Sequence, residues 1–406
     1  MIQKYLSVYA EPEIQALSLP VPERLFHAVL VLPIYDERLE SLLPFLEIKT
    51  SKPVAMIWVF NCPDNAEETA RTRTREVMNE VLARFRFHAL SQQVFCSKVR
   101  SSVDLYLLDC CSNGLELPAK QGVGLARKLG LDLGLKLVNN LPLTQDDPVP
   151  WMHSCDADVS LPVNYFDIPE QSSNVAACLY PFCHRPEPGY ELAMTLYEKS
   201  LHYYVDRLRW AGSPYAFHTI GSLIVVNPVS YAQVRGVPKR AGAEDFYLLN
   251  KLAKVGQVVS LEAPVLTIAG RASHRVPFGT GPALSKLRAM TKPEIEYRYY
   301  HPDIFVALKG VLQTVDQAEQ GFTSVAHFYQ QLDDEMSKGM AIHTQAVLGL
   351  LNIEKAFRHL AGNSGKAQFK RAFHTWFDGF ITLRFVHLMR DQGYPDVLLR
   401  EIDGAC

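Results

Sequence analysis

The chain has 406 residues, of which 48% are hydrophobic and 21% charged, and its formal net charge at pH 7 is −2. This composition is that of an ordinary globular protein with room for about two to three domains. No sign of charge dominates, so nucleic acid is not an expected partner, and an anionic ligand needs local cations. No apolar run approaches about 18 residues and no signal pattern opens the chain, so we expect a cytoplasmic protein without a membrane span.

Residues 1–24 follow no period and are expected to form an arm ahead of the first domain. Three apolar runs rich in β-branched residues come next, as in strands that are buried on both faces of a parallel sheet. These runs span residues 27–34, 53–60 and 103–109, and a helical stretch over 67–85 separates the last two. The order of strand, helix and strand predicts βαβ units and an α/β fold.

A glycine-rich segment follows the third expected strand. It reads Lys-Gln-Gly-Val-Gly-Leu-Ala-Arg-Lys over residues 120–128 and leads into a helix with one apolar residue per turn. The dinucleotide fingerprint G-x-G-x-x-G is not fulfilled, because Arg127 occupies its sixth position. Two interpretations remain: Lys120, Arg127 and Lys128 steady phosphate or ribose groups beside a helix start, or the glycines only permit a tight turn.

A pair of aspartates, Asp156 and Asp158, follows the apolar run that begins at Trp151. Residues two apart on an extended backbone point to the same side, so we expect both carboxylates at one end of a short strand. Two carboxylates this close repel each other unless a cation lies between them, which predicts a hard divalent ion such as Mg²⁺ or Mn²⁺. The alternative is that one aspartate caps the turn and the other is solvated.

Two further segments carry residues of functional interest before residue 270. Gly221-Ser222 precedes an apolar run and allows a close backbone approach, either to an acceptor or to another strand. Glu244 and Asp245 begin a helix, where acidic residues ordinarily serve as caps and dipole partners.

The segment 271–281 is a long loop rich in glycine and proline. It carries His274 between the cations Arg271 and Arg275. Loops with such residues usually bind a ligand, although a solvated surface is the alternative.

From about residue 285 the sequence changes to helical periods. Apolar residues at 304, 308, 311 and 315 predict one helical segment, and those at 342, 346, 350, 353, 357 and 360 predict another. We therefore expect a sheet domain over 25–284 and a helical domain over 285–406. The helical domain is expected to cover the sheet or to form a homodimer contact rather than to take part in catalysis.

In this order, the motifs resemble those of the family 2 glycosyltransferases and their relatives with the GT-A fold, a Rossmann-like sheet that binds a nucleotide-diphosphate sugar. The family's Pro-x-Tyr-Asn-Glu strand end has its counterpart in residues 33–37. Its D-x-D motif, Gly-x-x-x-Ala-Arg-like helix and Glu-Asp helix start match residues 156–158, 122–127 and 244–245. The resemblance covers about residues 25–282.

The resemblance implies a metal-dependent, inverting transfer of a sugar from a UDP- or GDP-linked donor to the hydroxyl of an unknown acceptor. Asp158 and His274 are then ligands of Mg²⁺ or Mn²⁺, with Asp156 between the ribose and the metal. Asp245 is the expected catalytic base, and Glu244 orients it or binds the acceptor. The other residues implied in nucleotide binding are Pro33, Tyr35, Glu37, Asn61, Lys120, Arg127, Arg271 and Arg275.

The sequence departs from the family pattern at three points. Asp36 replaces the usual asparagine, Asn61 stands where an acidic residue commonly contacts ribose or base, and no Gln-x-x-Arg-Trp motif occurs. The first two departures leave the donor open, and the third speaks against a polysaccharide synthase.

Two other classes stay open. A sugar-nucleotide-forming nucleotidyltransferase would favour a glycine-rich first loop with arginine and lysine, which residues 33–38 lack. A non-catalytic binding module of GT-A fold would not need both carboxylate pairs. Fold analogy alone does not decide between these classes.

Overall fold

The computed structural model divides the chain into two compact units. Unit 1 comprises Met1–Glu187 and Thr219–Gly279, and unit 2 comprises Pro188–His218 and Thr280–Cys406. The residues described are 1–145, 147–271, 279–318, 321–361 and 365–403. We expected a single division of the chain at residue 285. The two units instead alternate along the chain, because the helix α6 (Glu191–Trp210) belongs to unit 2.

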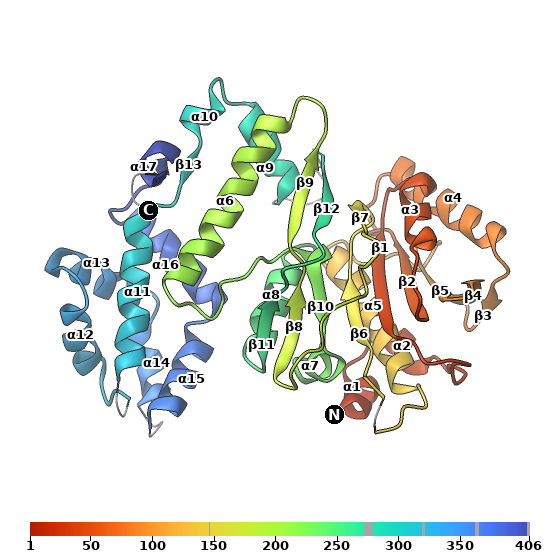
Figure 1. Ribbon diagram of the computed structural model, residues 1–406, viewed down its shortest axis with the longest axis horizontal. Helices are drawn as coiled ribbons and strands as arrows, with labels where there is room; N and C mark the ends of the chain where they lie inside the picture. The colour runs from red at the N-terminus through yellow and green to blue at the C-terminus, as the bar shows by residue number, and fades with distance from the viewer. Residues whose placement is uncertain (146, 272–278, 319–320, 362–364, 404–406) are drawn as a thin grey trace. The chain divides into compact units, whose positions relative to one another are not determined.

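Unit 1 is built on a nine-stranded sheet in the order β11-β8-β10-β6-β1-β2-β5-β4-β3 (Figure 1). The strands are β1 (Ala28–Ile34), β2 (Val54–Asn61), β3 (His88–Ala89), β4 (Val94–Arg100), β5 (Val103–Cys110), β6 (Trp151–Ser154), β8 (Val175–Leu179), β10 (Ile224–Val226) and β11 (Gln257–Ser260). All residues of β1 and β2 are buried, which explains their unbroken apolar sequence. The three strands expected first are confirmed as β1, β2 and β5.

The strand order reverses between β1 and β6. From β1 the chain proceeds through β2 to β5 on one side, and β6 then pairs in parallel with the other edge of β1. Val31 of β1 therefore pairs with Ile57 of β2 and with Ser154 of β6. In α/β sheets such a switch point leaves a crevice beyond the carboxyl ends of the two strands, where ligands bind. The residues after β1 and β6 are thus placed for a site.

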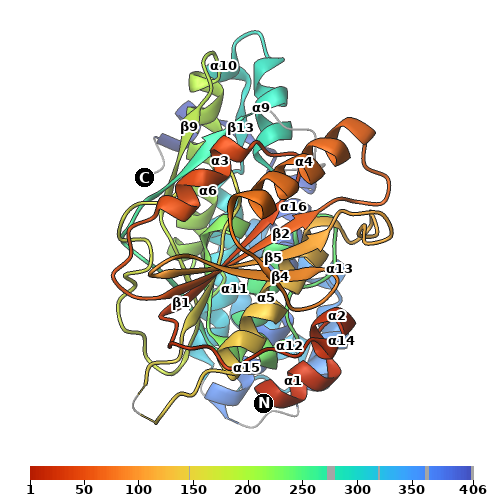
Figure 2. The same cartoon turned by 90° about the vertical axis from the view of Figure 1, so that its right-hand side faces the viewer.

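Helices and a small second sheet complete unit 1. The helices are α1 (Ile2–Val8), α2 (Pro12–Ala16), α3 (Leu39–Glu47), α4 (Glu68–Arg84), α5 (Gly122–Asn139), α7 (Pro228–Gln233) and α8 (Glu244–Leu252). Helices α3 and α4 pack against each other (Figure 2), and α5 packs on β1, β2 and β6. The second sheet has the order β7-β12-β9, formed by β7 (Val159–Ser160), β12 (Leu266–Gly270) and β9 (Phe182–Pro186).

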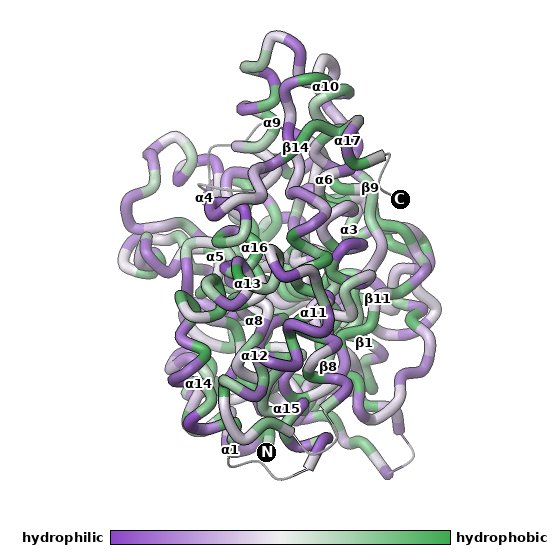
Figure 3. The backbone as a smooth tube through the Cα atoms, turned by 90° about the vertical axis from the view of Figure 1, so that its left-hand side faces the viewer, coloured by the Kyte–Doolittle hydropathy of each residue, from purple (hydrophilic) through white to green (hydrophobic). Residues whose placement is uncertain are grey.

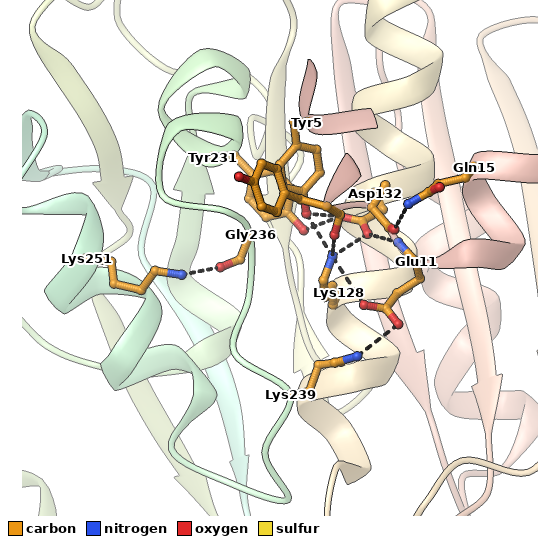
Figure 4. A network of polar contacts seen from close by, with 11 residues as sticks. Tyr5, Glu11, Gln15, Lys128, Asp132, Tyr231, Gly236, Lys239 and Lys251 are labelled. Carbon is orange, nitrogen blue, oxygen red and sulfur yellow. Dashed lines mark hydrogen bonds and ion pairs between the residues drawn. The ribbon is translucent and has the colours of Figure 1, made fainter. Parts of the chain in front are cut away.

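The N-terminal residues are held on α5 by a buried polar network (Figure 4). The hydroxyl groups of Tyr5 and Tyr231 donate hydrogen bonds to Asp132 at 2.6 and 2.8 Å. Lys128 Nζ lies 2.6 Å from the same carboxylate, and the backbone N–H of Glu11 donates to it at 2.9 Å. Burial outweighs these contacts and raises the pKa of Asp132. Residues 1–24 are therefore part of unit 1 rather than an arm outside it.

Unit 2 is helical. Its elements are α6, α9 (Thr280–Arg288), α10 (Pro293–Glu296), α11 (Pro302–Gln317), α12 (Val325–Asp334), α13 (Lys338–Leu350), α14 (Ile353–Leu360), α15 (Lys366–Trp376), α16 (Gly379–Asp391), α17 (Leu399–Asp403) and the antiparallel pair β13 (Arg298–Tyr299) and β14 (Val397–Leu398). Helix α6 packs against α9 and α11, which explains its place in this unit. None of the helices in the described part of the chain is long and apolar enough to cross a membrane.

The second helical segment expected in this region is broken. Asn352 adopts the left-handed conformation with φ of +61° and separates α13 from α14. Ile342 and Leu350 are 59% and 50% exposed, whereas Val347 and Leu348 enter the core. The periodic pattern across 342–360 therefore joined residues of two different helices, because a left-handed residue changes the direction of the chain.

The network around Asp132 generates a stability prediction. Replacing Lys128 by methionine is expected to cost about 3–5 kcal/mol of unfolding free energy, because a buried carboxylate loses its cation. Urea-induced unfolding followed by circular dichroism measures this change. The matched control is Lys4→Met, which removes an exposed lysine of α1 and should change the free energy by at most about 0.5 kcal/mol. Equal effects of the two substitutions would contradict the prediction.

Candidate functional site

The loop after β1 carries Asp36 and Glu37. Asp36 has a φ of +55°, a region in which asparagine and aspartate are tolerated better than most residues. Its backbone N–H donates to Thr74 Oγ1 of α4 at 3.0 Å, and its carboxylate contacts Arg73. The backbone conformation at this position suits aspartate and asparagine alike.

The loop after β6 differs from the expected extended strand. The strand ends at Ser154, and the backbone N–H of Val159 donates to the carbonyl oxygen of Asp156 at 3.3 Å to close a turn. The prediction that Asp156 and Asp158 share one side of a strand is therefore wrong in its premise. Each carboxylate instead has an arginine from another element beside it.

Arg127 is the arginine beside Asp156, and it is 2% exposed. Its Nη2 donates to Asp156 Oδ1 at 2.8 Å, and its Nε donates to Glu244 Oε1 at 3.1 Å. Nη1 contacts Ser154 Oγ and donates to the carbonyl oxygen of Gly221 at 3.4 Å. The two carboxylates raise the pKa of Arg127 in spite of its burial. The guanidinium group thus joins the end of β6 to the start of α8, and each of its three nitrogen atoms has an acceptor within the chain.

Gly221 lies where the Arg127 side chain needs space. It opens the short 3-10 turn η1 (Gly221–Leu223) before β10, and β10 runs antiparallel to β6, so its start lies at the edge where β6 ends. A Cβ atom on Gly221 would lie 2.6 Å from Arg127 Nη2. The close approach expected at Gly221-Ser222 is therefore made by an arginine side chain, not by a strand.

Gly124, in the first turn of α5, also leaves space for another segment of the chain. A Cβ atom on Gly124 would lie 2.5 Å from the carbonyl oxygen of Arg240 and 2.7 Å from that of Pro238. The backbone N–H of Gly124 donates to the Arg240 carbonyl oxygen at 3.0 Å. The segment that precedes α8 thus covers the helix start. The tight turn expected of the glycines is present at Gly122, the first residue of α5, which has a φ of +35°, and Gly124 also allows the close approach of the segment around Arg240.

The acidic pair at the start of α8 combines a fixed and a titratable carboxyl group. Glu244 is 4% exposed and is the one bound by Arg127. Asp245 is half-buried, and its Oδ1 accepts a hydrogen bond from the Phe246 N–H at 2.7 Å. Burial, and next the charge of Glu244, raise the pKa of Asp245 to about 7. A carboxyl group with such a pKa can take up and release a proton near neutral pH.

Arg271 connects the two loops at the switch point. It follows β12, which is placed beside Asp158 because the Ala269 N–H donates to the Asp158 carbonyl oxygen at 3.0 Å. The Arg271 guanidinium contacts the buried carboxylate of Glu37 and lies 3.7 Å from Asp158 Oδ2. The expected metal ligand His274 and the expected nucleotide contact Arg275 belong to residues 272–278, which lie outside the described residues.

The chemistry of the donor set suits a hard cation, although the described residues alone do not complete a metal site. Among them, no group of three or more His, Cys, Asp or Glu side chains is arranged to hold a metal ion. The carboxylate side chains of Asp156 and Asp158 are 37% and 25% exposed and offer oxygen ligands. A divalent ion there would take its remaining ligands from water, phosphate or residues outside this set.

The remaining residues expected to bind the nucleotide, Pro33, Tyr35, Lys120 and Asn61, differ in exposure. Pro33 is buried within β1, Tyr35 is half-buried in the following loop, and Lys120 is exposed. Asn61 ends β2 and is 6% exposed, and its Oδ1 has no hydrogen-bond partner in the described part of the chain. Ser154 was not expected in the site. Its signal was a polar residue at the end of an apolar strand, directly before the aspartate pair.

No family model and no curated protein matches the sequence. Among solved structures, the chain is similar to the mannosyltransferase PcManGT from Pyrobaculum calidifontis, in complex with GDP-Man and Mn²⁺. The two chains are 13% identical, the similarity covers 92% of each, and the TM-score is 0.34. With a similarity this distant, the functional argument depends on the geometry of the site itself.

Proposed function

We propose that the chain is a glycosyltransferase that moves a sugar from a nucleotide-diphosphate donor to an acceptor hydroxyl. The observation that carries this proposal is the convergence of two carboxylate pairs at the switch point of the sheet. Asp156 of the first pair and Glu244 of the second bind the same guanidinium group, that of Arg127. Such a site offers a donor position beyond the strand ends and a proton acceptor beside it.

The charge of the site supports metal dependence. The carboxylates near the guanidinium groups of Arg127 and Arg271 are those of Glu37, Asp156, Asp158, Glu244 and Asp245. An anionic nucleotide diphosphate would be repelled there unless a cation came with it. We therefore assign Asp156 and Asp158 as ligands of Mg²⁺ or Mn²⁺, with His274 as a further candidate. A bound ion would stabilise the negative charge of the departing diphosphate.

The acidic pair at α8 supplies the acid–base chemistry in this proposal. Asp245 accepts the proton of the acceptor hydroxyl, which is a poor nucleophile at neutral pH without a base. Glu244 is already bound by Arg127, so its role is to fix the start of α8 and to raise the pKa of its neighbour. Attack from the face opposite the diphosphate inverts the configuration of the anomeric carbon. Tyr35 and Asn61 are the candidates for contacts to base or ribose.

The test is hydrolysis of a panel of UDP- and GDP-sugars by the full chain, with and without Mn²⁺. Slow hydrolysis requires no knowledge of the acceptor, because water takes the place of the hydroxyl. A nucleotidyltransferase would instead release pyrophosphate from a nucleoside triphosphate and a sugar phosphate. A non-catalytic module would bind a nucleotide sugar without any turnover, and either of these two results would overturn the proposal.

The metal assignment predicts that Asp158→Asn abolishes the Mn²⁺-dependent part of nucleotide-sugar binding. The amide keeps the shape of the side chain but loses the charge that binds a hard cation. Calorimetric titration with UDP and GDP measures this loss. Asp36→Asn is the matched control at the same sheet edge, since asparagine also tolerates the left-handed backbone there. A donor affinity that falls equally in both variants would contradict the metal assignment.

The base assignment predicts that Asp245→Asn lowers turnover by about 100-fold or more and leaves donor affinity nearly unchanged. The reason is that the amide cannot accept the proton of the attacking hydroxyl. Steady-state kinetics together with calorimetry separate the two effects. If donor affinity is lost instead, Asp245 belongs to the nucleotide or metal site.

A pH dependence follows from the same group. Activity requires ionised Asp245, so kcat/KM should rise with pH and level off above about 7, the raised pKa of this carboxyl group. Removing the neighbouring charge in Glu244→Gln lowers that pKa, so the rising limb should move to lower pH. A pH profile measured on both proteins checks the direction of the shift. If the rising limb of the profile lies at the same pH in both proteins, a group other than Asp245 determines the pH dependence.

A further inference from the structure

Helices α14 and α15 of unit 2 mix hydrophilic and hydrophobic residues (Figure 3). Their apolar residues are buried in one core. Ile353 and Phe357 of α14 and Phe369 and Phe373 of α15 all belong to this core. The opposite faces are exposed and basic. They carry Lys355, Arg358 and His359 on α14, and Lys366, Lys370 and Arg371 on α15. Because the two helices pack against each other on one core, both basic faces point away from it.

The charge of this helix pair differs in sign from that of the whole chain. Residues 352–376 hold five lysine and arginine residues but a single acidic residue, Glu354, in a chain of net charge −2. Only one of the five has an ion-pair partner in the described part of the chain, namely Lys370, which lies 2.6 Å from Asp316. The other four cations therefore have no carboxylate partner among the described residues. An exposed group of this kind favours an anionic partner.

Large apolar side chains border the helix pair along the chain. Leu350, at the end of α13 just before α14, is 50% exposed. Phe380, at the start of α16 just after α15, is 38% exposed. Basic faces with neighbouring exposed apolar residues have the composition of an interfacial membrane site. A nucleic-acid backbone would contact the cations but would leave Leu350 and Phe380 without an apolar partner, whereas a lipid interface accommodates both kinds of side chain.

We infer that the exposed faces of α14 and α15 bind an anionic lipid surface, with Leu350 and Phe380 entering the interface beside them. This inference does not depend on the proposed activity, and it concerns attachment to the membrane surface without a spanning helix. Each lysine or arginine near such a surface contributes about fivefold to the partition coefficient. Attachment by four or five cations is therefore reversible and sensitive to salt.

The experiment is co-sedimentation of the full chain with vesicles of phosphatidylcholine alone or with about a third phosphatidylglycerol, a content at which the surface is strongly anionic. We expect binding to the anionic vesicles only, and its loss when salt is raised from about 0.1 to about 0.5 M. The double variant Lys355→Glu/Arg358→Glu should lower the partition coefficient by on the order of 25-fold or more. Leu350→Ser should weaken binding at about 0.1 M salt, because the lipid interface loses an apolar contact.

The matched control is Arg84→Glu/Lys98→Glu, which makes the same change of charge at exposed residues of unit 1. It should leave vesicle binding within about twofold, because these residues lie outside the proposed surface. Circular dichroism of both double variants verifies folding. Equal binding to neutral and anionic vesicles, equal effects of the two double variants, or retention on duplex DNA without vesicle binding would each overturn the inference.

Discussion

The buried guanidinium group of Arg127 is the interaction on which the candidate site depends. A guanidinium cannot give up its charge inside a protein, so its burial requires acceptors in the directions in which its N–H groups point. Asp156 and Glu244 supply charged acceptors, and Ser154 and Gly221 supply neutral ones. Removing either carboxylate would leave a buried cation partly uncompensated, so these residues constrain one another.

This constraint fixes the backbone around it. The turn at Gly221 has to approach the guanidinium closely, and the segment before α8 has to approach Gly124, so that Glu244 can reach Arg127. Each approach leaves too little space for a Cβ atom, which explains why glycine stands at both positions. The segment before α8 therefore packs on the start of α5, although the glycine-rich sequence of this helix start resembles that of a phosphate-binding loop.

Much of the fold was predictable, because buried strands have unbroken apolar sequences and β1, β2 and β5 differ from their surroundings in that respect. The carboxylate pairs stand out in the sequence after a strand and at a helix start, but the turn that separates Asp156 and Asp158 from the strand was not predicted. The partners of Arg127 were not, since contacts over 117 positions to Glu244 leave no local pattern. The assignment of α6 to unit 2 depends likewise on packing against distant helices, which periodicity does not reveal.

The two arginines at the switch point also differ in what they leave to a ligand. Arg127 is buried and holds Asp156 at 2.8 Å, so this carboxylate has a fixed position. Arg271 is half-buried, contacts Glu37 more closely, and lies 3.7 Å from Asp158. Because a contact at this distance in partly exposed surroundings is weak, a cation competes for Asp158 at lower cost than for Asp156. In the proposed metal site, Asp156 would therefore keep its position, whereas Asp158 would give up its contact with Arg271 to bind the ion.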